Sequence, residues 1–319
     1  MRRRCTKRVG TGSEAGRRLK LEIPLVGGLG NQLFIFAYGL FRRFHDGHYV
    51  QFKLIKEGLG NKTHGCRLLD EMCLDFEVAS AEEGGLATWM TKIQRFGSMR
   101  GFGSFVESIG SMVHLTEGRP LDAKPIDATM RSNTFFRDSG YFQDPSYLTW
   151  LQDFGILMDI VPAKPSRWFQ DQEAQLKVEN GIAVHVRRTD FDKKLGPGSL
   201  SVEYYKRVIS EAISGGEARR VVVFSDSIDS VKSEFLQHDF GTELEFSLPP
   251  NDSSDLESLA LMSKFDGLIM SNSTFSWWAA VTGNRGKAVT TPERWSRHES
   301  EPTTLNLAHW KIRESLWKA

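Results

Sequence analysis

The sequence predicts an α/β protein made of two Rossmann-like domains that face each other across a cleft. Near the N-terminus an apolar run of strand length, 21–26, is followed by a glycine turn and a helical pattern, which is the order of a βα unit. Between 181 and 281, strands and helices alternate at the spacing of a doubly wound parallel sheet. Pro162 and Pro165 disfavour helix continuation, so the linker is expected at 159–166.

The first domain opens with the strand at 21–26, the turn Gly-Gly-Leu-Gly at 27–30 and a helix that starts near Asn31. The helix is predicted because apolar residues recur at intervals of three and four positions and form one stripe. These residues are Leu33, Phe36, Ala37, Leu40, Phe41 and Phe44. The next strand is expected at 49–55, and from 57 to about 139 no clear element is indicated.

The second domain is expected to alternate four strands with four helices. The strands are predicted at 181–186, 221–224, 244–248 and 267–270, and the helices at 202–213, 228–236, 255–264 and 274–281. Ligands of such sheets bind at the carboxyl ends of the strands, where the motifs described below fall. The expected division is a basic, disordered tail at 1–20, a first domain at 21–160 and a second at 161–319.

Composition and charge exclude several classes of protein. With 319 residues, of which 40% are hydrophobic and 25% charged, the chain is long enough to bury a core. Its net charge is +1, yet eight basic residues and one acidic residue precede Leu21, so the remaining body is mildly acidic. Such a body argues against nucleic acid as the partner. The basic head is either a weak contact for an anionic membrane surface or an unstructured extension.

The cysteines indicate neither a disulfide framework nor a metal site. Cys5, Cys66 and Cys73 form an odd, dispersed set without a Cys-x-x-Cys pair, and adding His64 gives no zinc spacing. No window approaches the roughly 20 apolar residues of a membrane span, and no apolar core follows the basic head. The body is therefore expected to be soluble and cytoplasmic, and the head is either a peripheral contact with the inner face of the membrane or an unstructured extension.

The first motif is Gly-Gly-Leu-Gly-Asn-Gln at 27–32, directly after the opening strand. Glycines such as Gly28 let the backbone approach a ligand, and the helix start offers amide donors to an anion. Asn31 and Gln32 would close over that ligand. The alternative is a tight strand-to-helix turn, which requires glycine in any case.

The second motif is His-Val-Arg-Arg-Thr-Asp at 185–190, at the end of an apolar strand. Of the adjacent guanidiniums of Arg187 and Arg188, one can fork onto a phosphate while the other pairs with a carboxylate or a second phosphate. Asp190 is a candidate catalytic base, or a group that orients Arg187. A surface strand end with an Arg–Asp pair is the structural alternative.

Two further motifs follow strand ends in the second domain. Asp226 follows a strand and can accept the two donors of guanine, or else cap a helix. The run 271–278 carries hydroxyls at a helix start, where they can cap the helix or hold phosphate oxygens. Its candidate ligand residues are Ser273, Thr274, Phe275 and Ser276. Its two tryptophans, Trp277 and Trp278, fit a buried helix better than a stacking platform.

Together the motifs resemble glycosyltransferase family 11, the alpha-1,2-fucosyltransferases of bacterial type. The resemblance rests on the motifs at 27–32 and 185–190, on Gly-Tyr-Phe-Gln at 140–143, and on Tyr204-Tyr205, Phe224–Asp226, Leu261–Ser263 and Ser271–Trp278. It extends from Leu21 to about Trp295. The basic head and the stretch 84–121 depart from it, and the latter leaves acceptor specificity open.

The resemblance implies a GT-B-like fold and inverting transfer of fucose from GDP-fucose to the 2-hydroxyl of a galactose. It implies no metal or other cofactor, and a galactose-terminated oligosaccharide or a lipid-linked glycan as acceptor. Arg187 is then expected at the diphosphate with Arg188 beside it, Ser273, Thr274 and Ser276 around the phosphates, and His185 and Asp226 near guanine. Two alternatives stay open: a metal-dependent nucleotide-sugar transferase with a clamp of Asp190 and Asp192, and a non-catalytic nucleotide-binding module.

Overall fold

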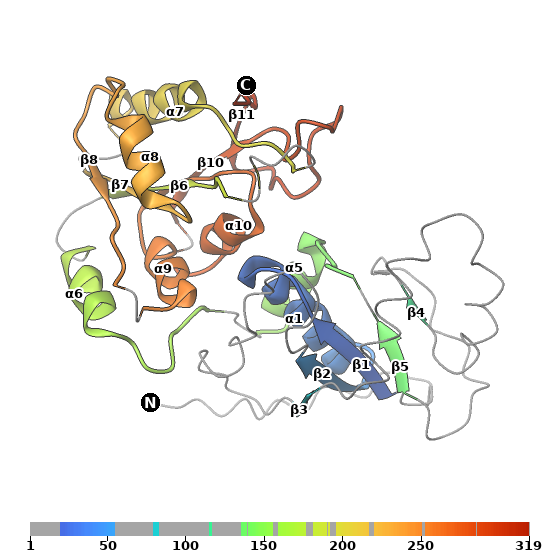
Figure 1. Ribbon diagram of the computed structural model, residues 1–319. Coiled ribbons are helices and arrows are strands. Elements are labelled where there is room, and N and C mark those ends of the chain that lie inside the picture. Colours follow the sequence, from blue (N-terminus) through green and yellow to red (C-terminus); the bar gives the residue numbers. More distant parts are fainter. Residues whose placement is uncertain are drawn as a thin grey trace. The chain divides into compact units, whose positions relative to one another are not determined.

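The computed structural model describes the protein as two α/β units, the first formed mainly before residue 158 and the second mainly by 158–319. The described residues are 20–54, 79–82, 115–116, 135–138, 140–155, 159–176, 181–189, 191, 196–216, 220–250, 253–284 and 286–318. Residues 1–19 of the basic head, the three cysteines, Asp190 and Asp192 lie outside these ranges, whereas Lys20, expected in the tail, begins the first strand. Figure 1 labels the elements of both units.

The first unit is built on a parallel sheet in the order β3-β2-β1-β5-β4. Its strands are β1 (Lys20–Leu25), β2 (Tyr49–Leu54), β3 (Ala79–Glu82), β4 (Leu115–Thr116) and β5 (Phe135–Asp138), and its helices are α1 (Leu29–Phe44) and α5 (Pro145–Asp153). Helix α1 lies close against the sheet at Gly39, where an added Cβ would stand 2.3 Å from Cζ of Phe52. The unit therefore has the βα start that the sequence predicts.

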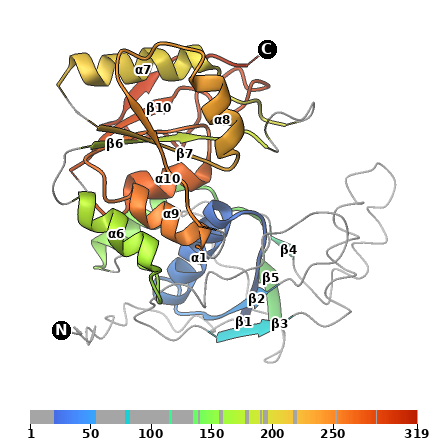
Figure 2. The same ribbon diagram turned by 60° about the vertical axis from the view of Figure 1, so that its left-hand side comes forward.

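The second unit has a parallel sheet in the order β11-β10-β9-β6-β7-β8. Its strands are β6 (Gly181–Val186), β7 (Arg220–Ser225), β8 (Leu244–Phe246), β9 (Gly267–Ile269), β10 (Ala288–Pro292) and β11 (Lys311–Arg313). Its helices are α6 (Arg167–Leu176), α7 (Val202–Ser214), α8 (Ile228–Phe235), α9 (Asp255–Met262) and α10 (Thr274–Val281). Both views show α7 and α8 on one face of this sheet and α9 and α10 on the other (Figures 1 and 2).

One hydrophobic core lies between this sheet and the helices α7 and α8. Strand β6 is buried along its whole length, which explains why it reads as a continuous apolar run rather than an alternating one. Val184 and Val223 of the sheet pack in one cluster with Tyr205 of α7 and Phe235 of α8. A serine accepts from the backbone at the start of α7, α9 and α10, which determines where these helices begin.

All eight elements predicted for the second domain are confirmed, with ends within two residues of the prediction. The first strand, the helix after it and the strand at 49–54 are confirmed as well. Elements that the sequence did not indicate are α5, α6, β10, β11 and the short strands β3, β4 and β5. None of the described helices combines the length and the apolar character needed to cross a membrane. The cleft between the domains stays a prediction.

Candidate active site

In the second unit the connections change direction at β6. From β6 the chain runs to β7 and β8 on one side, and then to β9, β10 and β11 on the other side. The carboxyl edge at such a switch point is where open α/β sheets bind ligands. The structure brings the predicted residues His185, Arg187 and Asp226 to this edge, because Val186 and Ser225 are partners in the parallel register of β6 and β7.

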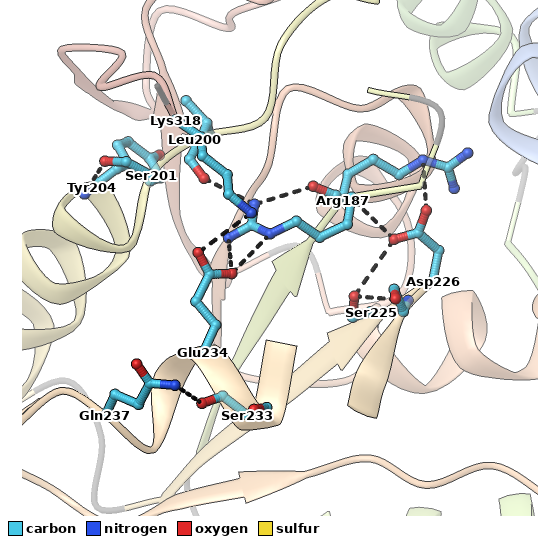
Figure 3. A network of polar contacts seen from close by, with 12 residues as sticks. Arg187, Leu200, Ser201, Tyr204, Ser225, Asp226, Ser233, Glu234, Gln237 and Lys318 are labelled. Atoms are coloured by element: carbon cyan, nitrogen blue, oxygen red, sulfur yellow. Dashed lines mark hydrogen bonds and ion pairs between the residues drawn. The ribbon is translucent and has the colours of Figure 1, made fainter. Parts of the chain in front are cut away.

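The carboxylate of Asp226 binds the segment that follows β6. Its Oδ1 accepts from the backbone N–H of Arg188 at 2.9 Å, and its Oδ2 lies 3.2 Å from Nε of Arg187. The hydroxyl of Thr189 also donates to Oδ2. Asp226 was expected to read guanine or to cap a helix, but the N-cap of α8 is Ser227 instead. Besides residues 187–189, the carboxylate contacts the hydroxyl of Ser225, which donates to Oδ1 at 3.5 Å. Figure 3 shows Asp226 facing Arg187.

Arg187 and Arg188 have different surroundings although they are adjacent. The Arg187 side chain keeps 23% of its surface exposed, and its Cζ lies 5.5 Å from the ring centroid of Phe191. The Arg188 side chain is 3% exposed and donates through Nε and Nη2 to Glu234 at 3.2 and 3.1 Å. It also donates to the carbonyl of Leu200 at 2.9 Å. Of the two guanidiniums, that of Arg187 is the more exposed, and that of Arg188 pairs with a carboxylate inside the fold.

His185 is buried and lies across the switch point from β9. Its Nδ1 is 2.8 Å from the hydroxyl of Ser271, and its ring lies 5.4 Å from that of Phe275, centroid to centroid. Burial first, and the charge of Arg187 second, lower the pKa of His185 from 6.5 to about 3, against the opposing effect of Asp226. The imidazole is therefore neutral at physiological pH. It aligns the ends of β6 and β9 and is 3% exposed.

The start of α10 follows β9 at the same edge. Ser273 is the N-cap residue, and its hydroxyl accepts from the N–H of Phe275 at 3.3 Å. Ser276 differs from the expected phosphate-facing position: it is fully buried, and its hydroxyl donates to the carbonyls of Ser271 and Ser273. Thr274 begins the helix at its partly exposed first turn. The first-turn amides of a helix have no intrahelical acceptor, so this end retains the electrostatics of an anion site.

The tryptophans that follow are core residues, as predicted. Trp277 and Trp278 are both fully buried, with ring planes nearly perpendicular to each other. The indole N–H of Trp277 donates to the carbonyl of Leu305 at 2.8 Å. This anchoring fixes the direction of α10, and with it the position of its first turn.

The first unit presents the glycine turn at its own switch point, where β1 lies between β2 and β5. Gly27 has φ +80, and an added Cβ would stand 3.0 Å from the ring of Tyr141. Gly28 has open space in place of a Cβ. Asn31 accepts from the side-chain amide of Gln143 at 2.9 Å, and Gln32 is buried, donating to the carbonyl of Gly27. Gly28 and Asn31 therefore lie at the surface of the turn, whereas Gln32 closes it from within.

The turn after β5, residues 140–143, was named in the sequence only as part of the family resemblance, with no role predicted for it. Phe142 adopts φ +47, which is costly for an aromatic residue and typical of functional sites. Its ring stacks on Tyr38 at 3.9 Å between centroids. The Tyr38 hydroxyl donates to Asp138 at 2.6 Å and accepts from Arg42 at 3.0 Å. This buried network holds the backbone that presents Gln143 to Asn31. The positive φ of a bulky residue has no local sequence signal.

Among the described residues no group of three or more His, Cys, Asp or Glu side chains could hold a metal ion. The proposed clamp residues Asp190 and Asp192 lie outside the described part of the chain, as does Asp190 in its role as candidate base. These two assignments stay predictions.

Three known proteins show what this chain is similar to. The "O-antigen biosynthesis glycosyltransferase WbnK" of Escherichia coli is 27% identical over 140 residues, which cover 41% of this chain and only 44% of that protein. The "Alpha-1,2-colitosyltransferase" of E. coli is 25% identical over 285 residues, covering 86% of this chain and 92% of that protein. Among solved structures, a mutant of Arabidopsis thaliana FUT1 in complex with GDP has a TM-score of 0.46 at 13% identity, covering 89% of this chain and 73% of that one.

The family comparison decides the assignment. The model of "Glycosyl transferase family 11" matches residues 125–312, which is more than half of the chain and includes every predicted site residue of the second unit. The switch-point residues His185, Arg187 and Asp226 all lie within the match. The chain therefore belongs to glycosyl transferase family 11.

Proposed function

We propose that the protein is a galactoside 2-alpha-L-fucosyltransferase, which transfers fucose from GDP-fucose to the 2-hydroxyl of a galactose residue with inversion. The observation that carries the proposal is the partly exposed guanidinium of Arg187, held by Asp226 at the switch point of a family 11 sheet. A cation in that place suits the diphosphate of a nucleotide sugar. The name of the E. coli colitosyltransferase supports an alpha-1,2 linkage.

In the proposed reaction the acceptor oxygen bonds to the anomeric carbon while the bond from that carbon to the β-phosphate oxygen breaks. The leaving GDP takes the bonding electron pair, so negative charge grows on the diphosphate. Arg187 stabilises that charge, together with the first-turn amides of α10 near Ser273 and Thr274. The acceptor hydroxyl gives up its proton to a base, for which Asp190 is the candidate. No metal is required in this proposal.

The supporting residues receive distinct roles. Arg188 positions the end of β6, because its guanidinium is buried against Glu234. Asp226 orients Arg187, since its carboxylate already accepts from residues 187–189. Gly28 and Asn31 of the first unit are assigned to the approach of the substrate. The acceptor is a galactose-terminated oligosaccharide or a lipid-linked glycan, and the basic head is the contact with an anionic membrane surface.

A second candidate differs only in the sugar that is transferred. The E. coli relative that aligns with 86% of this chain is named a colitosyltransferase, so colitose carried by a nucleotide is the competing donor. Both candidates use the same linkage and the same charged site.

A donor and acceptor panel tests the proposal. The purified protein is incubated with GDP-fucose, GDP-colitose, GDP-mannose or UDP-galactose and with β-galactosides, and the linkage of each product is determined. We expect GDP-fucose to be consumed fastest, with an alpha-1,2 product and with full activity in EDTA. Faster transfer from GDP-colitose would favour the second candidate. EDTA inhibition reversed by Mn²⁺ would support the metal-dependent alternative, and stabilisation by GDP without any transfer would support a binding module.

A further inference from the structure

Arg188 is surrounded by acceptors that come from three separate parts of the second unit. Its Nε and Nη2 contact Glu234 of α8, and its Nη1 donates to the carbonyls of Leu200 at 2.9 Å and Arg187 at 3.3 Å. Its backbone N–H donates to Asp226. The contacts of Arg188 thus fix the backbone next to Arg187, and with it the starting point of the Arg187 side chain.

A short segment near the C-terminus, residues 316–318, contacts both groups that bind Arg188, namely the backbone at Leu200 and the Glu234 carboxylate. Leu200 and Trp317 form an antiparallel bridge, with hydrogen bonds of 2.8 Å on either side, from Ser201 N–H to the Leu316 carbonyl and from Lys318 N–H to the Ser199 carbonyl. The Lys318 ammonium lies 3.6 Å from Oε1 of Glu234. Figure 3 shows Lys318 and Leu200 beside the Glu234 carboxylate.

The segment is anchored and lies outside the family match, which ends at residue 312. Leu316 and Trp317 pack against the hydrophobic core that also contains Val186, the last residue of β6. A buried cation such as Arg188 is tolerated only while its carboxylate partner stays in place. Asp226 is the other described carboxylate that contacts residue 188, through the backbone N–H, and it also pairs with Arg187. If Glu234 were lost, the Arg188 guanidinium would compete with Arg187 for Asp226.

We propose that Glu234, supported by segment 316–318, is a positioning residue for Arg187 that acts through Arg188. Glu234 keeps the Arg188 guanidinium away from Asp226, so that the Asp226 carboxylate stays with Arg187. Glu234 itself does not contact the substrate. The inference rests on the proposed function, in which Arg187 stabilises the leaving diphosphate.

The test compares Glu234→Gln of α8 with Glu245→Gln of β8, a control in the same unit whose carboxylate also pairs with an arginine. Glu245 pairs with Arg220 through two contacts of 2.7 Å, but at the amino end of β7, away from the switch point. We expect Glu234→Gln to lower kcat by about tenfold, by analogy with the loss of a hydrogen-bond partner that orients a metal-binding residue. Glu245→Gln should stay within about twofold of wild type, since its side chain is 49% exposed and lies away from the switch point. The acceptor KM should be unchanged in both.

A double-mutant cycle separates positioning from a general loss of structure. If Glu234 acts through Arg187, Glu234→Gln should add little to the loss caused by Arg187→Lys, whereas independent effects would multiply. Each variant is checked for a native melting transition. If Glu234→Gln does not fold, Lys318→Ala replaces it in the same cycle, with an expected loss of about threefold for a more exposed partner.

The outcomes distinguish this inference from the proposed function. Suppose that the wild type transfers sugar. The positioning role alone is then overturned if Glu234→Gln has the same kcat as Glu245→Gln, or if its effect on kcat multiplies with that of Arg187→Lys. If the wild type transfers no sugar, the same cycle is measured as GDP affinity by calorimetry. A wild type that neither transfers sugar nor binds GDP would overturn both.

Discussion

Asp226 Oδ2 lies 3.2 Å from Nε of Arg187, so that an ion pair joins the ends of the neighbouring strands β6 and β7. Because the contact uses Nε, the carboxylate fixes the plane of the guanidinium at the edge of the sheet. A residue that must neutralise growing charge benefits from such preorganisation, because it pays no reorganisation cost during the reaction.

Arg187→Lys should lower kcat by about 10² or more, by analogy with the loss of a single oxyanion donor. Lysine retains the charge but loses the planar fork and the Nε contact with Asp226. Steady-state kinetics with saturating donor measure the effect. Arg207→Lys is the control, since Arg207 forms an exposed pair with Glu211 on α7 and should retain wild-type rates. Equal activity of both variants would contradict the role of Arg187.

Asp226→Asn tests whether the carboxylate orients Arg187 or reads guanine. Asparagine has nearly the same shape but loses the charge that pairs with Arg187. If the orienting role is correct, affinities for GDP, ADP and UDP should all fall by a similar factor, about tenfold, for a lost charged partner. A selective loss of GDP affinity, with ADP and UDP unchanged, would instead assign guanine recognition to Asp226. Calorimetry with the three nucleotides measures this.

Gly28→Ala should leave stability unchanged and weaken substrate binding. Gly28 has φ −69, and an added Cβ meets nothing within 4 Å, so only an approaching ligand would detect the methyl group. Gly27→Ala, by contrast, should lower the free energy of unfolding by roughly 1–3 kcal/mol. Its φ of +80 and its contact with Tyr141 both oppose a side chain.

Two comparisons check this prediction. Gly47→Ala introduces a Cβ at φ +70 with no atom within 4 Å, so it isolates the backbone cost from the contact with Tyr141. Urea unfolding gives the stabilities, and KM values for donor and acceptor give the binding effects. Unchanged KM values in Gly28→Ala would show that no ligand approaches this turn.

His185 should make stability depend on pH below 6.5. Its pKa falls from 6.5 to about 3 on folding, so between these values the unfolded state binds more protons and the free energy of unfolding rises with pH. Wild type should therefore lose about 2 kcal/mol between pH 7 and pH 5 from this group. Urea unfolding at both pH values should show this loss in wild type and in the exposed control His309→Gln. His185→Gln should lack the contribution of His185 and keep that of other groups, such as His48, whose pKa burial also lowers. The same pH dependence in all three proteins would contradict a neutral, buried His185.

Local patterns in the sequence predicted most of the second unit. Apolar runs and amphipathic helical patterns, in alternation, predicted the elements from Gly181 to Val281. Burial on both faces makes β6 continuously apolar, and helix caps are short-range signals, so both can be recognised in the sequence. Strands β10 and β11 were missed because each contains only one large apolar residue, Val289 and Ile312, and so forms no apolar run in the sequence. The order of the motifs along the chain also placed them at strand ends.

The amino-acid pattern alone thus predicts the α/β class, the strand ends at which charged residues leave the sheet, and the family. It does not predict which partner each charged residue takes. Arg188 turns inward to Glu234, 46 positions later, while Arg187 pairs with Asp226. The physical reason is that these pairings depend on the parallel register of β6 with β7 and on the packing of α8 and segment 316–318 behind them. Register and packing join residues distant in sequence, and no local periodicity encodes them.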